Sequence, residues 1–100
     1  MSANPARGEA AILVDGEHVV LRPSFEALVA AEEELGPLFA LVERAADGRL
    51  ALNETAALFW HCAGGAVARE RIGQVLVEMG LAKAAPVLRT LLGQILQGRV

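Results

Sequence analysis

The residues of this chain that could do nucleophilic or metal chemistry are one cysteine, Cys62, and two histidines, His61 and His18. A zinc site needs three or four ligands in a tetrahedral array, and a cysteine nucleophile needs a base within hydrogen-bonding distance. Neighbouring helical residues point about 100° apart, so His61 and Cys62 do not converge on one atom. His18 lies on a different predicted element. We therefore predict a non-enzymatic protein with no catalytic residue, metal site or cofactor, in which His61 is a surface histidine beside a buried cysteine.

Three short clusters could bind ions, but their spacing indicates ordinary roles. Residues 32–34 are consecutive glutamates on a predicted helix, so their carboxylates fan around the axis and form a solvated face. The Arg-Glu-Arg run at 69–71 indicates the exposed start of a later helix. Gly64-Gly65 lacks the spacing, the lysine and the preceding strand of a phosphate-binding loop.

The composition fits one small domain and argues against nucleic acid as a partner. The chain has 100 residues, with nine Lys and Arg scattered against twelve Asp and Glu, and a formal net charge of −3. Nucleic-acid binding normally needs a clustered basic face. Hydrophobic residues make up 54% of the chain, a surplus that indicates either a dense core or a face reserved for a partner. We prefer the core for most of it.

The number of cysteines and the length of the apolar segments indicate the cellular compartment in which the protein folds. With a single cysteine no internal disulfide can form, which suits a reducing cytoplasm. The first residues lack the basic and apolar regions of a signal peptide. The longest apolar runs fall far short of the about 20 residues that a spanning helix needs. We expect a cytoplasmic protein that does not enter the membrane.

A β-hairpin is predicted over residues 9–22, because Asp15-Gly16 separates two runs rich in β-branched residues. The two-residue turn fixes the register, with the pairs Leu13–His18, Ile12–Val19, Ala11–Val20 and Glu9–Arg22. One face then consists of Ile12, Val14, Val19 and Leu21. Two strands alone are marginally stable, so this apolar face must pack on helices or on a partner.

Apolar residues at helical spacing predict five helices, at about residues 25–35, 38–46, 54–63, 67–79 and 84–97. Ser24 and Asn53 are the predicted N-caps of the first and third, and Pro86 should lie in the first turn of the last. The third helix is apolar nearly all round, which is typical of a central helix. Gly73 and Gly93 lie inside helices and are candidates for close helix approach. The predicted core faces of the other four helices are Leu28, Ala31 and Leu35; Leu38, Leu41, Val42 and Ala45; Ala68, Ile72, Val75, Leu76 and Met79; and Leu88, Leu91, Leu92, Ile95 and Leu96.

These elements predict a mainly α fold, in which an N-terminal β-hairpin is followed by a compact bundle of about five short helices. We expect a single domain over residues 1–100, with the hairpin at 9–22 and the helical bundle at 24–97. The hairpin should cover one side of the bundle.

The candidate partner-binding residues are Leu13, His18 and Val20, on the mixed face of the hairpin, and Trp60. The hairpin edges could add a strand from another chain, or could be exposed and blunted by Glu17 and Arg22. An indole is a common interface anchor, but a lone tryptophan in a small helical domain is also a common core residue.

Several short segments, in this order, carry a resemblance to a known family: Arg7-Gly8-Glu9, the strand pair, Leu35-Gly36, Gly48-Arg49-Leu50 and Gly80-Leu81. Over residues 4–96 the chain resembles the gene transfer agent family of small tail proteins, which is similar to phage tail assembly chaperones. Val67-Ala68 departs from the pattern, because it stands where a Ser or Thr cap is expected before the fourth helix.

The resemblance implies a chaperone-like role in tail assembly, in which the protein shields the tape-measure or tail-tube protein of a gene transfer agent or phage-like particle. The alternative is a structural tail-associated subunit that stays in the particle. A homo-oligomer is left open. A small-molecule-binding or enzymatic helical domain would need convergent buried polar groups, of which the sequence offers few.

Overall fold

The N-terminal hairpin forms around the Asp15-Gly16 turn. In the computed structural model, which describes residues 4 and 9–98, strands β1 (Ala10–Val14) and β2 (Glu17–Leu21) pair antiparallel. Asp15 has φ 51° and Gly16 has φ 84°, the left-handed pair that a type I′ turn requires. The predicted pairs within the strands are confirmed: Leu13–His18, Ile12–Val19 and Ala11–Val20. Beyond them, Glu9 and Arg22 form an ion pair of 3.2 Å.

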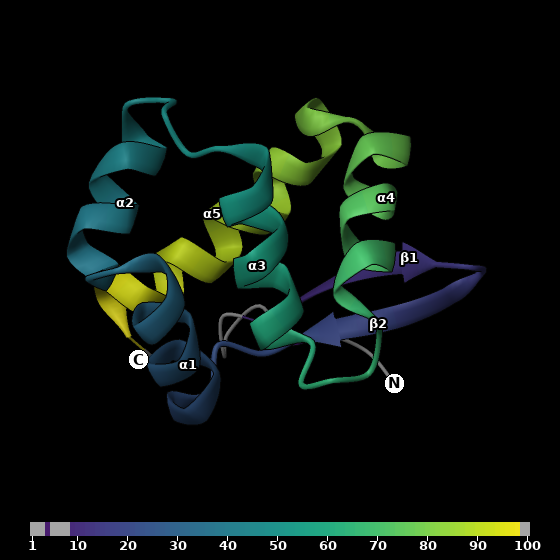
Figure 1. The fold of residues 1–100 in the computed structure, drawn as a ribbon, viewed down its shortest axis with the longest axis horizontal. Coiled ribbons are helices and arrows are strands. Elements are labelled where there is room, and N and C mark those ends of the chain that lie inside the picture. Colours follow the sequence, from purple (N-terminus) through teal and green to yellow (C-terminus); the bar gives the residue numbers. More distant parts are fainter. Residues whose placement is uncertain (1–3, 5–8, 99–100) are drawn as a thin grey trace.

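Five helices follow, which confirms the mainly α fold. They are α1 (Phe25–Leu35), α2 (Leu38–Ala46), α3 (Leu52–Cys62), α4 (Arg69–Met79) and α5 (Leu81–Gln97). Figure 1 shows α3 near the centre, with α1 and α2 on one side, α4 and the hairpin on the other, and α5 passing behind.

Local hydrogen bonds set both ends of α1 and the start of α2. The Ser24 hydroxyl accepts from the Ala27 amide at 3.2 Å, so the predicted N-cap of α1 is confirmed. Gly36 has φ 91° and donates its N–H to the Glu32 carbonyl, which ends the helix. The Glu32 carboxylate then accepts from the Leu38 amide at 3.0 Å, at the start of α2.

The predicted start of α3 is wrong, because Asn53 lies inside the helix and Ala51 is the residue that caps it. Alanine has no side-chain acceptor, so only the other half of a capping box forms. The Ala51 amide donates to Glu54 at 3.0 Å, and Arg44 reaches the same carboxylate at 2.5 Å. These two partners, the amide first, lower the pKa of Glu54.

The starts of α4 and α5 also differ from the prediction. α4 begins at Arg69, not at Val67, and Ala68 is an exposed N-cap rather than a core residue. α5 begins at Leu81, directly after Gly80, so Pro86 lies in its interior rather than in its first turn. A proline there removes one backbone donor, which tertiary packing of the helix must compensate.

The core lies where α3 meets the other elements. Leu58 and Phe59 of α3 are fully buried, as predicted for a central helix. The largest other fully buried side chains are Leu21, Leu41, Ile72, Leu76 and Leu91, so both the hairpin and α5 contribute to one core. The predicted face of α2 is confirmed, with Leu41 buried and Leu38, Val42 and Ala45 packed against the core. Leu96 is a correction, since 55% of it is exposed.

Replacing Leu91 with Ala should lower the free energy of unfolding by about 2–5 kcal/mol, because its fully buried side chain would leave a cavity. Leu96→Ala, at an exposed position near the end of the same helix, should change the free energy of unfolding by less than about 0.5 kcal/mol. Urea denaturation of both variants and the wild type checks this. A loss below about 1 kcal/mol for Leu91→Ala would contradict the packing of α5.

Gly73 and Gly93 do not mark close helix approach, since a Cβ built at either position meets no atom within 4 Å. Gly73→Ala should therefore stabilise the protein by about 0.5–1 kcal/mol, by reducing the freedom of the unfolded chain. Gly80→Ala is the contrasting control, because Gly80 has φ 85° and a side chain there is strained. Thermal unfolding should show opposite shifts, and equal shifts would refute the argument.

Candidate partner-binding surfaces

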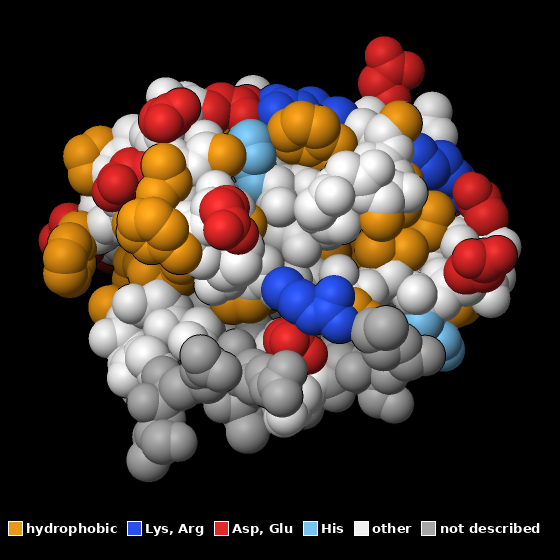
Figure 2. All heavy atoms as spheres, turned by 90° about the horizontal axis from the view of Figure 1, so that it is seen from below, with side chains coloured by type: hydrophobic (Ala, Val, Ile, Leu, Met, Phe, Trp, Pro, Cys, Tyr) orange, Lys and Arg blue, Asp and Glu red, His pale blue; other side chains and the backbone are white. Residues whose placement is uncertain are grey.

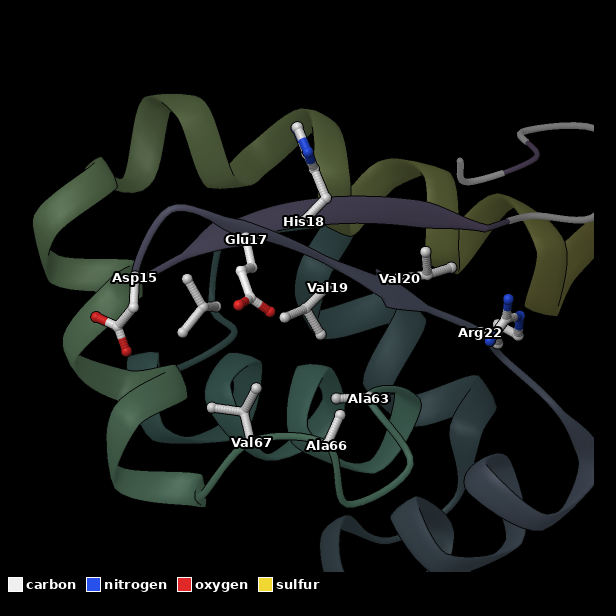
Figure 3. A pocket seen from close by; sticks show the side chains of 10 residues that line it. Asp15, Glu17, His18, Val19, Val20, Arg22, Ala63, Ala66 and Val67 are labelled. Atoms are coloured by element: carbon white, nitrogen blue, oxygen red, sulfur yellow. The ribbon is translucent and has the colours of Figure 1, made fainter. Parts of the chain in front are cut away.

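The structure brings three of the four predicted binding residues to the hairpin. Leu13 and His18 are cross-strand partners, and Val20 lies two residues along β2. Leu13 is 57% exposed, His18 is exposed and Val20 is half-buried. In Figure 3, His18 and Val20 point to one side of β2, whereas Glu17 and Val19 point to the other. Their role in binding stays a prediction.

Trp60 lies elsewhere, on α3, where it packs against the core and is half-buried. The guanidinium carbon of Arg69 stands 4.4 Å from the centre of its ring, a cation–π contact. The His61 ring meets it edge-on at 4.9 Å. Trp60 therefore belongs to a polar cluster between α1, α3 and α4 rather than to the hairpin.

That cluster centres on Glu34, which the sequence placed on a solvated face. Its carboxylate contacts Arg69 at 2.5 Å and His61 Nε2 at 2.7 Å. Hydrogen bonds from Arg69 first, and then from His61, lower the pKa of Glu34 to about 2. The His61 side chain is only 11% exposed, so the prediction of a surface histidine is wrong. Glu34 accounts for its burial by supplying a hydrogen-bond partner.

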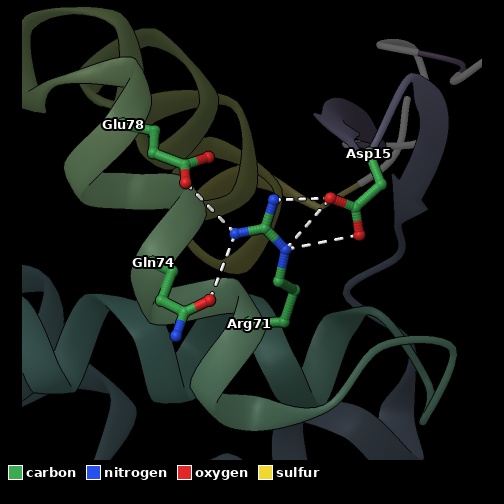
Figure 4. A network of polar contacts seen from close by, with 4 residues as sticks. All are labelled: Asp15, Arg71, Gln74 and Glu78. Carbon is green, nitrogen blue, oxygen red and sulfur yellow. Dashed lines mark hydrogen bonds and ion pairs between the residues drawn. The ribbon is translucent and has the colours of Figure 1, made fainter.

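A second polar cluster fixes the tip of the hairpin to α4. Arg71 reaches Asp15 with two nitrogens, at 2.6 and 3.2 Å, and reaches Glu78 at 3.3 Å and Gln74 at 3.2 Å (Figure 4). The Arg71 partner lowers the pKa of Asp15. Bidentate arginine–carboxylate pairs fix orientation as well as distance, so the turn is held in one place.

A groove of about 550 Å³ lies between β2 and the loop that joins α3 to α4. β2 contributes Glu17, His18, Val19 and Val20, and the loop contributes small or β-branched residues, Ala63, Ala66 and Val67. Figure 3 shows Ala66 and Val67 across the groove from Val19 and Glu17. The groove is therefore apolar at its base and acidic toward the turn.

A more apolar surface lies at the opposite end of the molecule, along α2 and α5. A groove of about 500 Å³ there is lined by Val42, Ala45, Ala46, Ala85, Leu88, Arg89, Leu92, Gly93 and Leu96. A neighbouring hollow of about 250 Å³ shares Ala45, Ala85 and Leu88 and extends the groove to Leu81. We call this continuous surface the α2–α5 face. Figure 2, seen from below, shows hydrophobic side chains on the left, the end at which α1 and α2 lie in Figure 1, and others at the top and on the right.

The comparisons with known proteins give one match. The model of the family described as phage tail tube protein, GTA-gp10, matches residues 7–98. The chain belongs to this family. The predicted resemblance to small tail proteins of gene transfer agents is thereby confirmed. No curated protein and no solved structure matches the chain.

In this member of the GTA-gp10 family, the single cysteine, Cys62, is buried. Burial raises the pKa of the Cys62 thiol to about 12, so it is protonated at neutral pH. Over the described residues, no group of three or more His, Cys, Asp or Glu side chains could hold a metal ion. None of the described helices is both long and apolar enough to cross a membrane.

Sequence reasoning missed the α2–α5 face of this tail protein. One signal was available, because Phe39 falls off the predicted apolar side of its helix and is 79% exposed. Leu81 lay outside the predicted last helix, and Leu96 was assigned to the core. A large aromatic residue on the solvent-facing side of an amphipathic helix indicates a surface that contacts another molecule.

Replacing Glu34 with Gln should remove a pH-dependent part of the stability. The pKa of Glu34 is lowered from 4.5 to about 2, so the stabilisation is present above pH 4.5 and is lost as the pH falls toward 2. The difference in unfolding free energy between wild type and Glu34→Gln should therefore shrink on acidification. Glu33→Gln is the control, since the neighbouring Glu33 is exposed. Denaturation across this pH range checks it, and a constant difference would contradict the cluster.

Proposed function

We propose that this protein is a non-enzymatic, chaperone-like factor of tail assembly, which binds the tape-measure or tail-tube protein in the cytoplasm before that protein is incorporated. The observation that carries the proposal is the α2–α5 face with Phe39 beside it. It exposes large apolar side chains that the fold does not bury, on a small protein whose net charge is −3.

The α2–α5 face suits a partner with a helical apolar stripe. Its lining includes Val42, Leu88 and Leu92, and among the described residues Arg89 is its one charged lining residue. Phe39 lies about one turn before Val42 on α2, at the outer border of the packed side of the helix, and is 79% exposed. Such a groove accepts the apolar face of an amphipathic helix, as in helix-in-groove recognition.

The energetics favour a reversible contact. Fully burying one Leu or Phe side chain contributes about 1.5–3 kcal/mol, and association costs several kcal/mol in lost freedom. Burial of Phe39, Leu81 and Leu96 therefore supports binding that stronger contacts in the assembled tail can displace. A chaperone needs such release.

The alternative is a structural subunit that stays in the tail. The family description, phage tail tube protein, favours it. In that case the α2–α5 face would lie against a neighbouring subunit of the finished tail, which includes another copy of this chain.

Replacing both Phe39 and Leu96 with Ser should weaken capture of the tape-measure or tail-tube protein by about tenfold or more, because each variant removes an exposed apolar contact. The matched control is Val77→Ser, an exposed apolar residue on α4 that does not line the α2–α5 face. Co-expression followed by measurement of the partner's soluble fraction checks this, with circular dichroism to show that each variant folds. An equal effect of the double variant and of Val77→Ser would contradict the proposed surface.

The same tagged protein distinguishes the two functions. A chaperone should co-purify with a tail protein from producing cells and be missing from finished particles by mass spectrometry. A structural subunit should be present in both. Absence of any tail protein from the captured fraction would overturn both.

A further inference from the structure

The outer edge of β2 presents unpaired backbone groups. In a two-residue hairpin the residues that flank the turn form a hydrogen-bonded pair, and pairs then alternate along the strands. Val14–Glu17 is such a pair, so Leu13–His18 and Ala11–Val20 are non-hydrogen-bonded pairs whose N–H and C=O groups point outward. Outside the β1–β2 ladder, no backbone hydrogen bond involves His18 or Val20 among the described residues.

The backbone of Arg22 follows the same alternation of inward and outward N–H groups, and its outward N–H already has a hydrogen-bond partner. It is the next outward-pointing residue after Val20, and its N–H donates to the Cys62 carbonyl at 2.8 Å. The helical body therefore already uses one position of this edge, and the backbone groups of the two positions before it have no backbone hydrogen bond to the part of the chain that the structure describes.

The groove beside β2 runs along the length of this strand. It is lined by four consecutive residues of β2, residues 17–20, whose side chains alternate between the faces. Figure 3 shows Glu17 and Val19 pointing toward Ala66 and Val67, and His18 and Val20 pointing to the other side of the strand. The far wall is the loop with Ala63, Ala66 and Val67, which leaves about 550 Å³ free.

The edge is held in place at both ends. The Arg22–Cys62 hydrogen bond fixes the end of β2, and Arg71 fixes the turn through Asp15 (Figure 4). A strand edge already fixed in its bound position loses little conformational freedom when a segment pairs with it.

We infer that the outer edge of β2 is a docking site for an extended segment of another protein chain. The segment pairs with the backbone of His18 and Val20, and places small or β-branched side chains against Val19, Ala66 and Val67. Near the turn it carries lysine or arginine. Asp15, Glu17 and Glu78 outnumber Arg71 there, and Glu17 has no ion-pair partner among the described residues. The site is separate from the α2–α5 face, and the inference rests on the proposed function only in taking the partner to be a tail protein.

The test uses short synthetic peptides of alternating Val and Thr, with two lysines at either end, and measures binding by fluorescence polarisation. His18→Pro removes one outward N–H and should weaken binding by about tenfold. Ala11→Pro is the matched control, because Ala11 is the cross-strand partner of Val20 and its N–H points out of the opposite edge. It should leave the affinity unchanged. Glu17→Lys should weaken the lysine peptides and favour peptides that end in two glutamates.

Amide hydrogen exchange of the wild-type protein gives a second measurement that needs no variant. Peptide binding should slow exchange at His18 and Val20 and leave Leu13 unchanged. Failure of all the lysine peptides to bind, or equal weakening by His18→Pro and Ala11→Pro, would overturn the inference. Protection of His18 and Val20 at high protein concentration without peptide would also overturn it, by showing that a second copy occupies the edge. None of these outcomes bears on the proposed function, since no tail protein and no residue of the α2–α5 face enters the test.

Discussion

A two-stranded hairpin cannot bury its apolar face by itself, and the rest of this structure follows from that constraint. Ile12, Val14 and Leu21 are buried only because α3, α4 and α5 pack against the strands. The hairpin in turn closes one side of a core that five short helices would leave open. Neither part buries its apolar surface without the other, so the chain folds around their shared boundary.

The polar clusters serve this arrangement by fixing the elements at their ends. Glu34 joins α1 to the end of α3 and the start of α4, and Arg71 joins α4 to the hairpin turn. Exposed ion pairs contribute little stability singly, but a carboxylate shared by Arg69 and His61 also selects one geometry. Arg71 and Asp15 hold the turn end of the β2 groove, whereas the α2–α5 face lies at the other end and, among the described residues, is lined by apolar residues and glycines apart from Arg89 and Thr55.

Much of the fold could be predicted because its signals are local. Asp15-Gly16 determines its own turn, the turn determines the register, and the face of α2 follows from a spacing within nine residues. The errors have physical causes. The side chain of Ala51 cannot accept a capping hydrogen bond, so the sequence gives no sign that this residue caps α3. Pro86 is tolerated in the interior of α5 because tertiary packing overrides the low helix propensity of proline. Glu34 and Arg69 are 35 residues apart, so no local pattern could pair them. The α2–α5 face could not be predicted for the same reason, since it forms only when two helices that are distant in the sequence pack together.

The two attachments of β2 respond differently to the solvent. The Arg22–Cys62 contact is a backbone hydrogen bond, which dissolved ions hardly screen, whereas Arg71 and Asp15 form an exposed ion pair. Rising ionic strength therefore loosens the turn while the other end of β2 stays attached. The strands themselves stay in place through the buried residues Ile12, Val14 and Leu21, so the position of the Asp15-Gly16 turn is the part of the hairpin that follows the salt concentration.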